Sequence, residues 1–358
     1  MAGRPDCGTA RREAGFSWFV GSSQGALRQL TGTPIREFNL NADACVEAYR
    51  RGRPLVREMF GGEVGLPGLT TPAVSYGHVS CLGSELLFPD GGEVAHTHPC
   101  GSLEAGLGVL REPVDWATAG MAPFYLEFRE RMTEAFPGER VGFAFGAEGP
   151  LTTAYELRGE GFFTDIFDDP PLAQEFLHAV TGSILDYERF HSSIEDRPLP
   201  NPDGGGMCDD LASFIPARRM RELVLPFWEA YYRGTTTGPR SAHVEDLRAE
   251  QLFALEEIGL SHYDPSISPK LTPRIIAEHC RVPFVWRLGC FHYRDMTCRD
   301  VEDFVFDAAA GDASGVITYV AEAICNEESV PKVHAFIRAA KEAQRLIAAG
   351  CPREGIGR

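Results

Sequence analysis

The second half of the chain repeats one pattern, in which a short apolar run ends in polar residues and a segment of helical periodicity follows. Such alternation predicts parallel strands joined by helices that pack on the sheet. The number of repeats favours a closed (β/α)8 barrel of the TIM type over an open, doubly wound sheet. The polar-ended runs are residues 207–210, 241–245, 261–264, 283–289 and 315–321.

The first half of the chain fits the same α/β barrel, preceded by an extension. Helical patterns cover residues 43–51, 123–136 and 170–192. The run at 140–148 ends in Gly-Pro, as a buried parallel strand would, and two apolar runs within 71–88 are strand-like. The first 35 residues are rich in Gly and Arg and have weak periodicity, as a loosely structured arm would. We therefore expect an N-terminal arm over 1–38 and one barrel domain over 39–358.

The composition limits the classes of partner. A formal net charge of −17 argues against nucleic acid and against an anionic membrane, since both favour a basic surface. No apolar run approaches the ~18 residues of a membrane span, and the first residues lack the apolar core of a signal peptide. The ten cysteines include no CxxC pair, which is typical of buried thiols in a reducing cytoplasm. We expect a cytoplasmic protein with a small-molecule substrate, and no GxGxxG motif follows a strand to indicate a dinucleotide.

Candidate site residues follow from the barrel geometry. In a parallel barrel the loops after the strands converge, so active sites gather at the strand C-termini. The polar residues that end the apolar runs are Tyr76, His78, Asp209, Asp210, His243, Glu245, Tyr263, Asp264, Arg287, Glu322 and Cys325. From this set and one neighbour we predict substrate contacts by Tyr76, His78, Asp209, His262 and Arg287.

His243-x-Glu245 is the most informative pair. Side chains two residues apart on a strand point to the same face, so both can reach one metal ion or one substrate. Imidazole together with carboxylate suits zinc, iron or manganese. The alternative is a hydrogen-bonded pair that orients a loop or acts in acid–base chemistry.

Asp209, Asp210 and Arg287 each have two interpretations. One of the adjacent carboxylates can face the barrel mouth while the other caps the next helix, or both can belong to a solvated loop. Arg287 ends an apolar strand, where a guanidinium requires an anionic partner. That partner is either a substrate carboxylate or phosphate, or the carboxylate of Asp264 or Glu322.

His96-x-His98-x-Cys100 has a spacing similar to metal-binding motifs. However, Pro99 lies within it, and a helix start follows at Ser102. We interpret this segment as a surface or lid loop, with a metal site as the alternative.

Four stretches of the chain resemble the uroporphyrinogen decarboxylase superfamily, which includes the corrinoid-linked methyltransferases. LGSELLFPDGGEV (82–94) resembles its LG-aliphatic-FP-DG hairpin, and residues 149–187 resemble its central strand–helix–helix passage. CDDLASFIPARRMRELVLPFWEAYY (208–232) resembles its DD-L segment, and KVHAFIRAAKEA (332–343) resembles its last helix. The order and spacing of the four stretches carry the resemblance.

The resemblance implies a TIM-type barrel and points to the methyltransferase branch. True porphyrinogen decarboxylases have an Arg-rich N-terminal motif that this chain lacks. The methyltransferase branch is similar to a zinc site of His-x-Cys with a distant Cys, in which zinc lowers the pKa of the thiol that attacks the methyl group. Here the pair is His243-x-Glu245, and the distant ligand is Cys325 or Glu322. The carboxylate of Glu245 is a harder ligand than the thiolate it replaces, which makes iron or manganese alternatives to zinc.

Two enzymatic hypotheses follow. The first is a metal-dependent methyltransferase or demethylase acting on a small molecule, with a corrinoid protein as partner. The second is a decarboxylase or lyase of a small carboxylated substrate, with Asp210, Tyr263 and Arg287 as catalytic residues. In it Arg287 holds the carboxylate, Asp210 stabilises the protonated intermediate, and Tyr263 or His262 delivers the proton. A non-catalytic barrel is disfavoured because burying so many ionisable groups costs stability. A homodimer is a further expectation.

Overall fold

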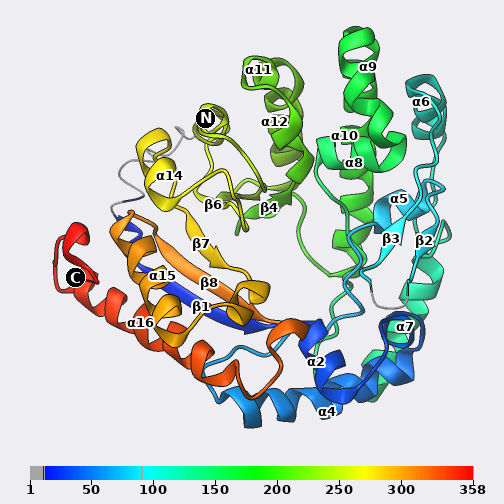
Figure 1. Cartoon of the computed structure of the whole chain (residues 1–358). Helices are drawn as coiled ribbons and strands as arrows, with labels where there is room; N and C mark the ends of the chain where they lie inside the picture. Colours follow the sequence, from blue (N-terminus) through cyan, green and yellow to red (C-terminus); the bar gives the residue numbers. More distant parts are fainter. Residues whose placement is uncertain (1–10, 12, 90–91, 358) are drawn as a thin grey trace. The chain divides into compact units, whose positions relative to one another are not determined.

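The chain divides into two compact units. The computed structural model describes residues 11, 13–89 and 92–357. Unit 1 comprises Met1–Thr33, Glu47–Pro67 and Ser241–Arg358, and unit 2 comprises Pro34–Val46 and Gly68–Arg240. Both units combine helices with parallel strand pairing (Figure 1).

Parallel strands organise unit 1. Strands β1 (Ser17–Ser22), β8 (Gly315–Val320) and β7 (Val285–Leu288) form one sheet in the order β1-β8-β7. Strand β5 (Arg240–His243) pairs in parallel with β6 (His262–Asp264). A parallel bridge from Tyr263 to Phe284 continues this order from β6 toward β7. The C-terminal ends of five strands in unit 1 therefore point the same way.

Helices cover one face of the sheet in unit 1. Helices α15 (Cys298–Ala310) and α16 (Val330–Ala348) pack together and against β8 and β1 (Figure 1). Val20, Val316, Val305 and Phe336 are buried in this layer and form part of the core. The remaining helices of unit 1 are α2 (Gln24–Thr31), most of α4 (Ala42–Phe60), η4 (Ala249–Gln251), α13 (Phe253–Glu257), α14 (Pro273–His279), η5 (Cys290–Arg294), η6 (Glu322–Ile324) and η7 (Arg353–Gly355).

Unit 2 is mainly helical and is built around α10 (Pro170–Ile194). This helix packs against α6 (Leu103–Arg111), α8 (Pro150–Arg158), α9 (Phe162–Asp168) and α12 (Leu225–Thr235). The apolar stripe of α10 is buried, as its helical spacing predicts. The other elements are α3 (Ile35–Leu40), α5 (Gly77–Cys81), β2 (Leu86–Leu87), β3 (Ala95–His96), α7 (Ala122–Ala135), η1 (Gly159–Gly161), β4 (Gly205–Cys208), η2 (Asp210–Phe214), η3 (Ala217–Arg219) and α11 (Met220–Leu223).

Two strand predictions in unit 2 are wrong. Residues 140–148 form no strand and make only isolated parallel bridges, Thr70 with Gly142 and Val74 with Phe145. Residues 77–81 form helix α5 instead of a strand. Gly77 allows this turn because its backbone lies against Phe145 and Gly146, where an added Cβ would be 2.8 Å from the Gly146 carbonyl oxygen. By contrast, the predicted helices at 123–136 and 170–192 are confirmed as α7 and α10.

The structure supports a parallel α/β fold, whereas the predicted eight-stranded barrel is not shown. The described strands form sheets of two or three strands. The segment expected as a loose arm is regular from Ser17 onward, because it forms β1 and then α2, which Ser23 caps. The division into an arm over 1–38 and a barrel over 39–358 stays a prediction, and residues 1–10 and 12 of that arm lie outside the described residues.

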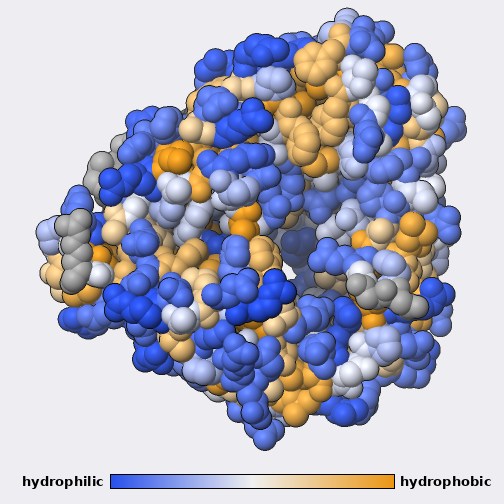
Figure 2. Space-filling model, in the orientation of Figure 1, coloured by the Kyte–Doolittle hydropathy of each residue, from blue (hydrophilic) through white to orange (hydrophobic). Residues whose placement is uncertain are grey.

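Hydrophilic residues predominate on the face of the molecule in Figure 2, and hydrophobic residues form scattered groups there. Phe19 and Tyr319 of unit 1 are two of the few large hydrophobic side chains exposed among the described residues. No helix in the described part of the chain is long and apolar enough to cross a membrane.

Candidate active site

A row of polar side chains crosses neighbouring strands on one face of unit 1. His243 ends β5 and is register-paired with Asp264, which ends β6. Side chains at paired positions of parallel strands point to the same face, and the face alternates at each residue. The bridge of Tyr263 to Phe284 therefore puts Asp264 on the same face as Arg287 of β7.

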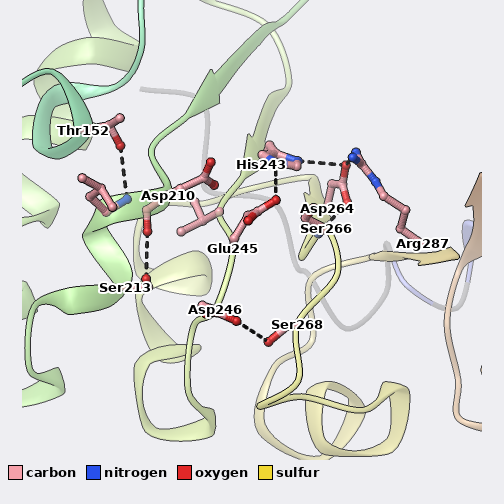
Figure 3. A network of polar contacts seen from close by, with 12 residues as sticks. Thr152, Asp210, Ser213, His243, Glu245, Asp246, Asp264, Ser266, Ser268 and Arg287 are labelled. Atoms are coloured by element: carbon pink, nitrogen blue, oxygen red, sulfur yellow. Dashed lines mark hydrogen bonds and ion pairs between the residues drawn. The ribbon is translucent and has the colours of Figure 1, made fainter. Parts of the chain in front are cut away.

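Asp264 joins the other two members of this row. Its Oδ2 lies 3.0 Å from His243 Nδ1 and also accepts a hydrogen bond from Arg287 Nη2 (Figure 3). Its Oδ1 accepts from the backbone N–H of Ser266 at 2.8 Å. Burial alone would raise the pKa of Asp264, but the His243 hydrogen bond and the charges of Arg287 and His243 lower it below its usual value. Asp264 is therefore a well-paired carboxylate.

Glu245 approaches the other ring nitrogen of His243. It follows β5, and its Oε1 lies 3.6 Å from His243 Nε2 (Figure 3). The interaction with His243 is the largest influence on Glu245 and lowers its pKa. Partial burial raises this pKa, but the effects of His243, Ser266 and Arg287 together outweigh burial. His243 thus lies between two ionised carboxylates, one at each ring nitrogen.

The donor atoms of this pair fit a divalent metal ion. An ionised carboxylate can only accept hydrogen bonds, so His243 Nδ1 donates to Asp264, which leaves Nε2 as the ring nitrogen that a metal ion would bind. Two ligands of one tetrahedral zinc ion, each about 2.1 Å from it, lie about 3.4 Å apart. The observed separation of 3.6 Å is close to this value. His243 and Glu245 belong to a group of side chains that could hold a metal ion.

The two residues predicted as distant ligands have other partners. Glu322 forms an ion pair with Arg28 at 3.0 Å and lies over Gly25, where an added Cβ would be 2.2 Å from Glu322 Oε2. The thiol of Cys325 donates to the Ala321 carbonyl at 3.2 Å. Burial, with Glu322 and Cys290 nearby, raises the pKa of Cys325 to about 12. Cys325 is therefore a neutral thiol here, whereas a zinc ligand must be a thiolate.

The two candidate proton donors of β6 lie on opposite faces. Tyr263 is fully buried on the face of Phe284, and its hydroxyl donates to the Val244 carbonyl at 3.0 Å. His262, two residues before Asp264, shares the face of the polar row and is partly exposed. Burial lowers its pKa, and Asp264 opposes this effect. Only His262 of these two thus keeps a position suited to proton transfer in unit 1.

In unit 2, Asp209 is a fully buried helix cap. It accepts hydrogen bonds from Trp228 Nε1 at 2.6 Å, from the N–H of Thr152 at 2.7 Å and from the N–H of Leu151 at 3.3 Å. The two N–H groups begin α8, whose positive end favours a carboxylate. Burial raises the pKa of Asp209 to about 6, although these hydrogen bonds oppose it. These contacts give Asp209 a structural role in this unit.

Asp210, the neighbouring candidate, starts η2. Its backbone carbonyl accepts from Ser213 Oγ at 2.8 Å, and Leu211 N–H donates to Thr152 Oγ1 at 3.2 Å (Figure 3). The side chain of Asp210 is half-buried. Its predicted catalytic role stays a prediction.

The other residues of unit 2 predicted to contact substrate are His78 and Tyr76. His78 is fully buried, its Nε2 lies 2.9 Å from Ser183 Oγ, and burial lowers its pKa to about 3. This is the environment of a core histidine. Tyr76 packs against His96, with ring centroids 4.3 Å apart, and His98 Nδ1 lies 2.9 Å from the Glu156 carbonyl. Tyr76 and the two histidines of the predicted loop therefore lie in one aromatic group.

Glu156 is a residue that the sequence patterns did not single out. Its side chain is 3% exposed, and its Oε1 has no hydrogen-bond partner among the described residues. Burial, then Glu148 and Asp209, raise its pKa well above the usual value. The available signal was an acid between Tyr155 and Leu157 within a helix that is otherwise short of charge.

Comparison with known proteins gives an informative likeness to a solved structure. No family model matches the chain, and no curated protein matches it. A methyltransferase from Methanosarcina mazei has a similar structure, with a TM-score of 0.65 and 17% sequence identity, over 94% of this chain and 97% of that one. Bee venom hyaluronidase in complex with a hyaluronic acid tetramer matches over 93% of this chain and 99% of that one, at 12% identity. Its TM-score of 0.31 is too low to support an argument. The first likeness shows that the two chains share a fold.

Proposed function

We propose that the chain is an enzyme of methyltransferase type in which His243 and Glu245 bind a divalent metal ion beside a small-molecule substrate. The observation that carries the proposal is the arrangement of His243, whose Nδ1 bonds Asp264 while Nε2 lies 3.6 Å from Glu245 Oε1. A carboxylate behind a histidine is the usual support of a metal-binding imidazole. The fold likeness to a methyltransferase and the resemblance of four sequence stretches favour this reaction class.

Each residue of the row has a task in this proposal. Asp264 fixes the tautomer and the ring orientation of His243 and makes Nε2 a better donor. Arg287 neutralises Asp264 and keeps it ionised. A bound zinc, iron or manganese ion would supply Lewis acidity that lowers the pKa of a thiol or hydroxyl of the methyl acceptor. A corrinoid protein as methyl carrier is part of the proposal, as is Cys325 or Glu322 as a ligand recruited when the metal binds.

The decarboxylase hypothesis has less support. It gives a proton-transfer role to Tyr263, whose hydroxyl bonds a backbone carbonyl on the face opposite the polar row. Metal-dependent methyl transfer requires no such role for Tyr263.

Elemental analysis of protein purified without added metal tests the proposal. We expect about one equivalent of zinc, iron or manganese in the full chain, and a loss of most of it in His243→Ala and Glu245→Gln. His279→Ala is the matched control, because His279 lies on α14 of the same unit, is exposed and bonds only a carbonyl of its own helix. Metal-free wild-type protein that also fails to bind added Zn²⁺, or metal retained in both variants, would overturn the proposal.

A further inference from the structure

Two exposed aromatic rings extend the polar row of unit 1. Phe19 of β1 is 47% exposed and Tyr319 of β8 is 38% exposed. Their ring centroids lie 5.8 Å apart in an edge-to-face arrangement. Most other aromatic rings on the strands of unit 1 are buried or half-buried, so this pair is an apolar platform open to solvent.

The strand register puts the platform on the same face as the candidate site. Phe19, Ile317 and Arg287 occupy paired positions on β1, β8 and β7. Tyr319 follows two residues after Ile317 and therefore points to the same face. Asp264 of β6 shares this face because it bonds Arg287.

An unbroken series of side-chain contacts connects the platform to His243 of the proposed metal-ligand pair. The Arg287 guanidinium lies over the Tyr319 ring, 5.4 Å from its centroid. Arg287 donates to Asp264, and Asp264 bonds His243. The five parallel strands therefore carry one strip of side chains on this face. It runs from the aromatic rings through the Arg287 guanidinium to the imidazole and the carboxylates.

Glycines leave room for the two rings of the platform. A Cβ added to Gly21 would be 2.6 Å from Phe19 Cε1 and 3.2 Å from Tyr319 Cδ1, so both rings lie over a strand position that has no side chain. Gly65, which bridges Gly21 in parallel, would bring a Cβ 3.4 Å from the Phe19 ring. The backbone therefore supports the two rings from below, and an aromatic ligand can stack on one ring while it meets the edge of the other.

Arg287 retains hydrogen-bonding capacity beside the rings. A guanidinium has five N–H groups, and in the described structure Arg287 donates one hydrogen bond, to Asp264. Its side chain is 22% exposed, so solvent reaches part of it. A planar guanidinium next to an aromatic surface suits an oxygen anion attached to a flat ring.

We propose that this strip binds a substrate with a flat, aromatic ring and an oxygen anion, with the ring on Phe19 and Tyr319 and the anion on Arg287. The inference deepens the proposed function and rests on it only for the reaction that follows binding. The reacting group of the substrate would extend from the ring toward His243 and Glu245.

Titration of the full chain with benzoate, cyclohexanecarboxylate and acetate, followed by NMR or calorimetry, tests the inference. We expect benzoate to bind about three- to tenfold more tightly than cyclohexanecarboxylate, the range given by aromatic pairing. The double variant Phe19→Leu/Tyr319→Leu should remove this preference and leave acetate binding unchanged. Arg287→Met should weaken all three carboxylates. Phe167→Leu is the control, because Phe167 of unit 2 is 50% exposed and should change nothing.

The outcomes separate this inference from the proposed function. The titrations are repeated after treatment with EDTA, and the metal content of each variant is measured. A preference for benzoate that depends on Phe19 and Tyr319 in metal-free protein supports the substrate class even if no metal binds. Equal affinity for benzoate and cyclohexanecarboxylate, or an unchanged preference in the single variant Tyr319→Leu and in the double variant, would overturn it.

Discussion

Two acidic regions of the molecule have opposite electrostatics. In unit 1, Asp264 and Glu245 contact His243 and lie near Arg287, and their pKa values are lowered. In unit 2, Asp209 and Glu156 are buried beside other acids, and their pKa values are raised. The first region therefore holds negative charge, whereas the second disfavours it.

The difference comes from the partners available to each carboxylate. Asp264 is bonded by a guanidinium and an imidazole, which favour its ionised form. Among the described residues, Asp209 receives hydrogen bonds from neutral donors, and Glu156 has an oxygen without a partner. Glu148 and Asp209 also repel the charge of Glu156. A carboxylate paired with cations and still partly open can bind a metal or polarise a ligand, whereas a buried one between neutral donors mainly organises the fold.

The largest effect is expected from Asp209→Ala. It removes the acceptor for Trp228 Nε1 and for two N–H groups at the start of α8, and it leaves these donors buried. We expect the free energy of unfolding to fall by about 3–5 kcal/mol, measured by urea denaturation. Asp203→Ala, at an exposed position of the same unit, should cost less than about 0.5 kcal/mol. A similar small loss for both variants would contradict the structural role of Asp209.

The pH dependence of stability should have opposite signs in the two regions. The pKa of Asp209 rises from 3.8 to about 6 on folding, so its ionisation opposes folding. Wild type should therefore lose stability relative to Asp209→Asn as the pH rises from ~4 to ~6.5. A pKa shift of about two units corresponds to a change of about 3 kcal/mol in the free energy of unfolding. The pKa of Asp264 is lowered, so its contribution is present above its unfolded pKa and is lost as pH falls. Urea titrations at about pH 2.5, 4.5 and 7.5 on wild type, Asp209→Asn and Asp264→Asn measure this, because the Asp264 contribution is lost only below its unfolded pKa. The same sign for both variants would refute the contrast.

The sequence predicted the position of this row because it depends on local patterns. Polar residues at the ends of β5, β6 and β7 identified His243, Asp264 and Arg287, and the ion pair of Arg287 with Asp264 was one of the two expected alternatives. The same pattern could not distinguish Asp209, because its buried state depends on Trp228, which lies 19 residues away on a different helix. Pairing partners, not residue type, determine the charge of a carboxylate.

The fold predictions failed where strand formation depends on long-range pairing. The run at 140–148 is apolar enough for a strand, but its bridges to Thr70 and Val74 are isolated. Strand β1 was missed because its short apolar run follows a Gly- and Arg-rich segment, and its stability comes from β8, about 300 residues later in the chain. Neither contact has a signal in the local sequence.

Asp264→Asn should have a smaller effect, on metal affinity. Loss of the carboxylate removes the group that orients His243 Nδ1, and such changes reduce metal affinity by about 10–100-fold. Competition with a chromophoric chelator measures this for Zn²⁺. Asp246→Asn is the matched control, because Asp246 lies in the same unit and pairs with Lys270 at 3.1 Å instead of with His243. Equal affinities of the two variants would show that Asp264 does not support the metal-binding imidazole.

The smallest effect is expected from Glu156→Gln. Burial and two neighbouring acids raise the pKa of Glu156 well above the usual value and so favour its neutral form. An amide of the same shape should therefore change the free energy of unfolding by less than about 1 kcal/mol. Glu195→Gln is the matched control, since Glu195 is also buried but bonds Arg140 and the Phe143 N–H, so its loss of charge should cost about 2–3 kcal/mol. If Glu156→Gln is the more destabilising of the two, Glu156 is ionised and paired, and the two acidic regions share the same electrostatics after all.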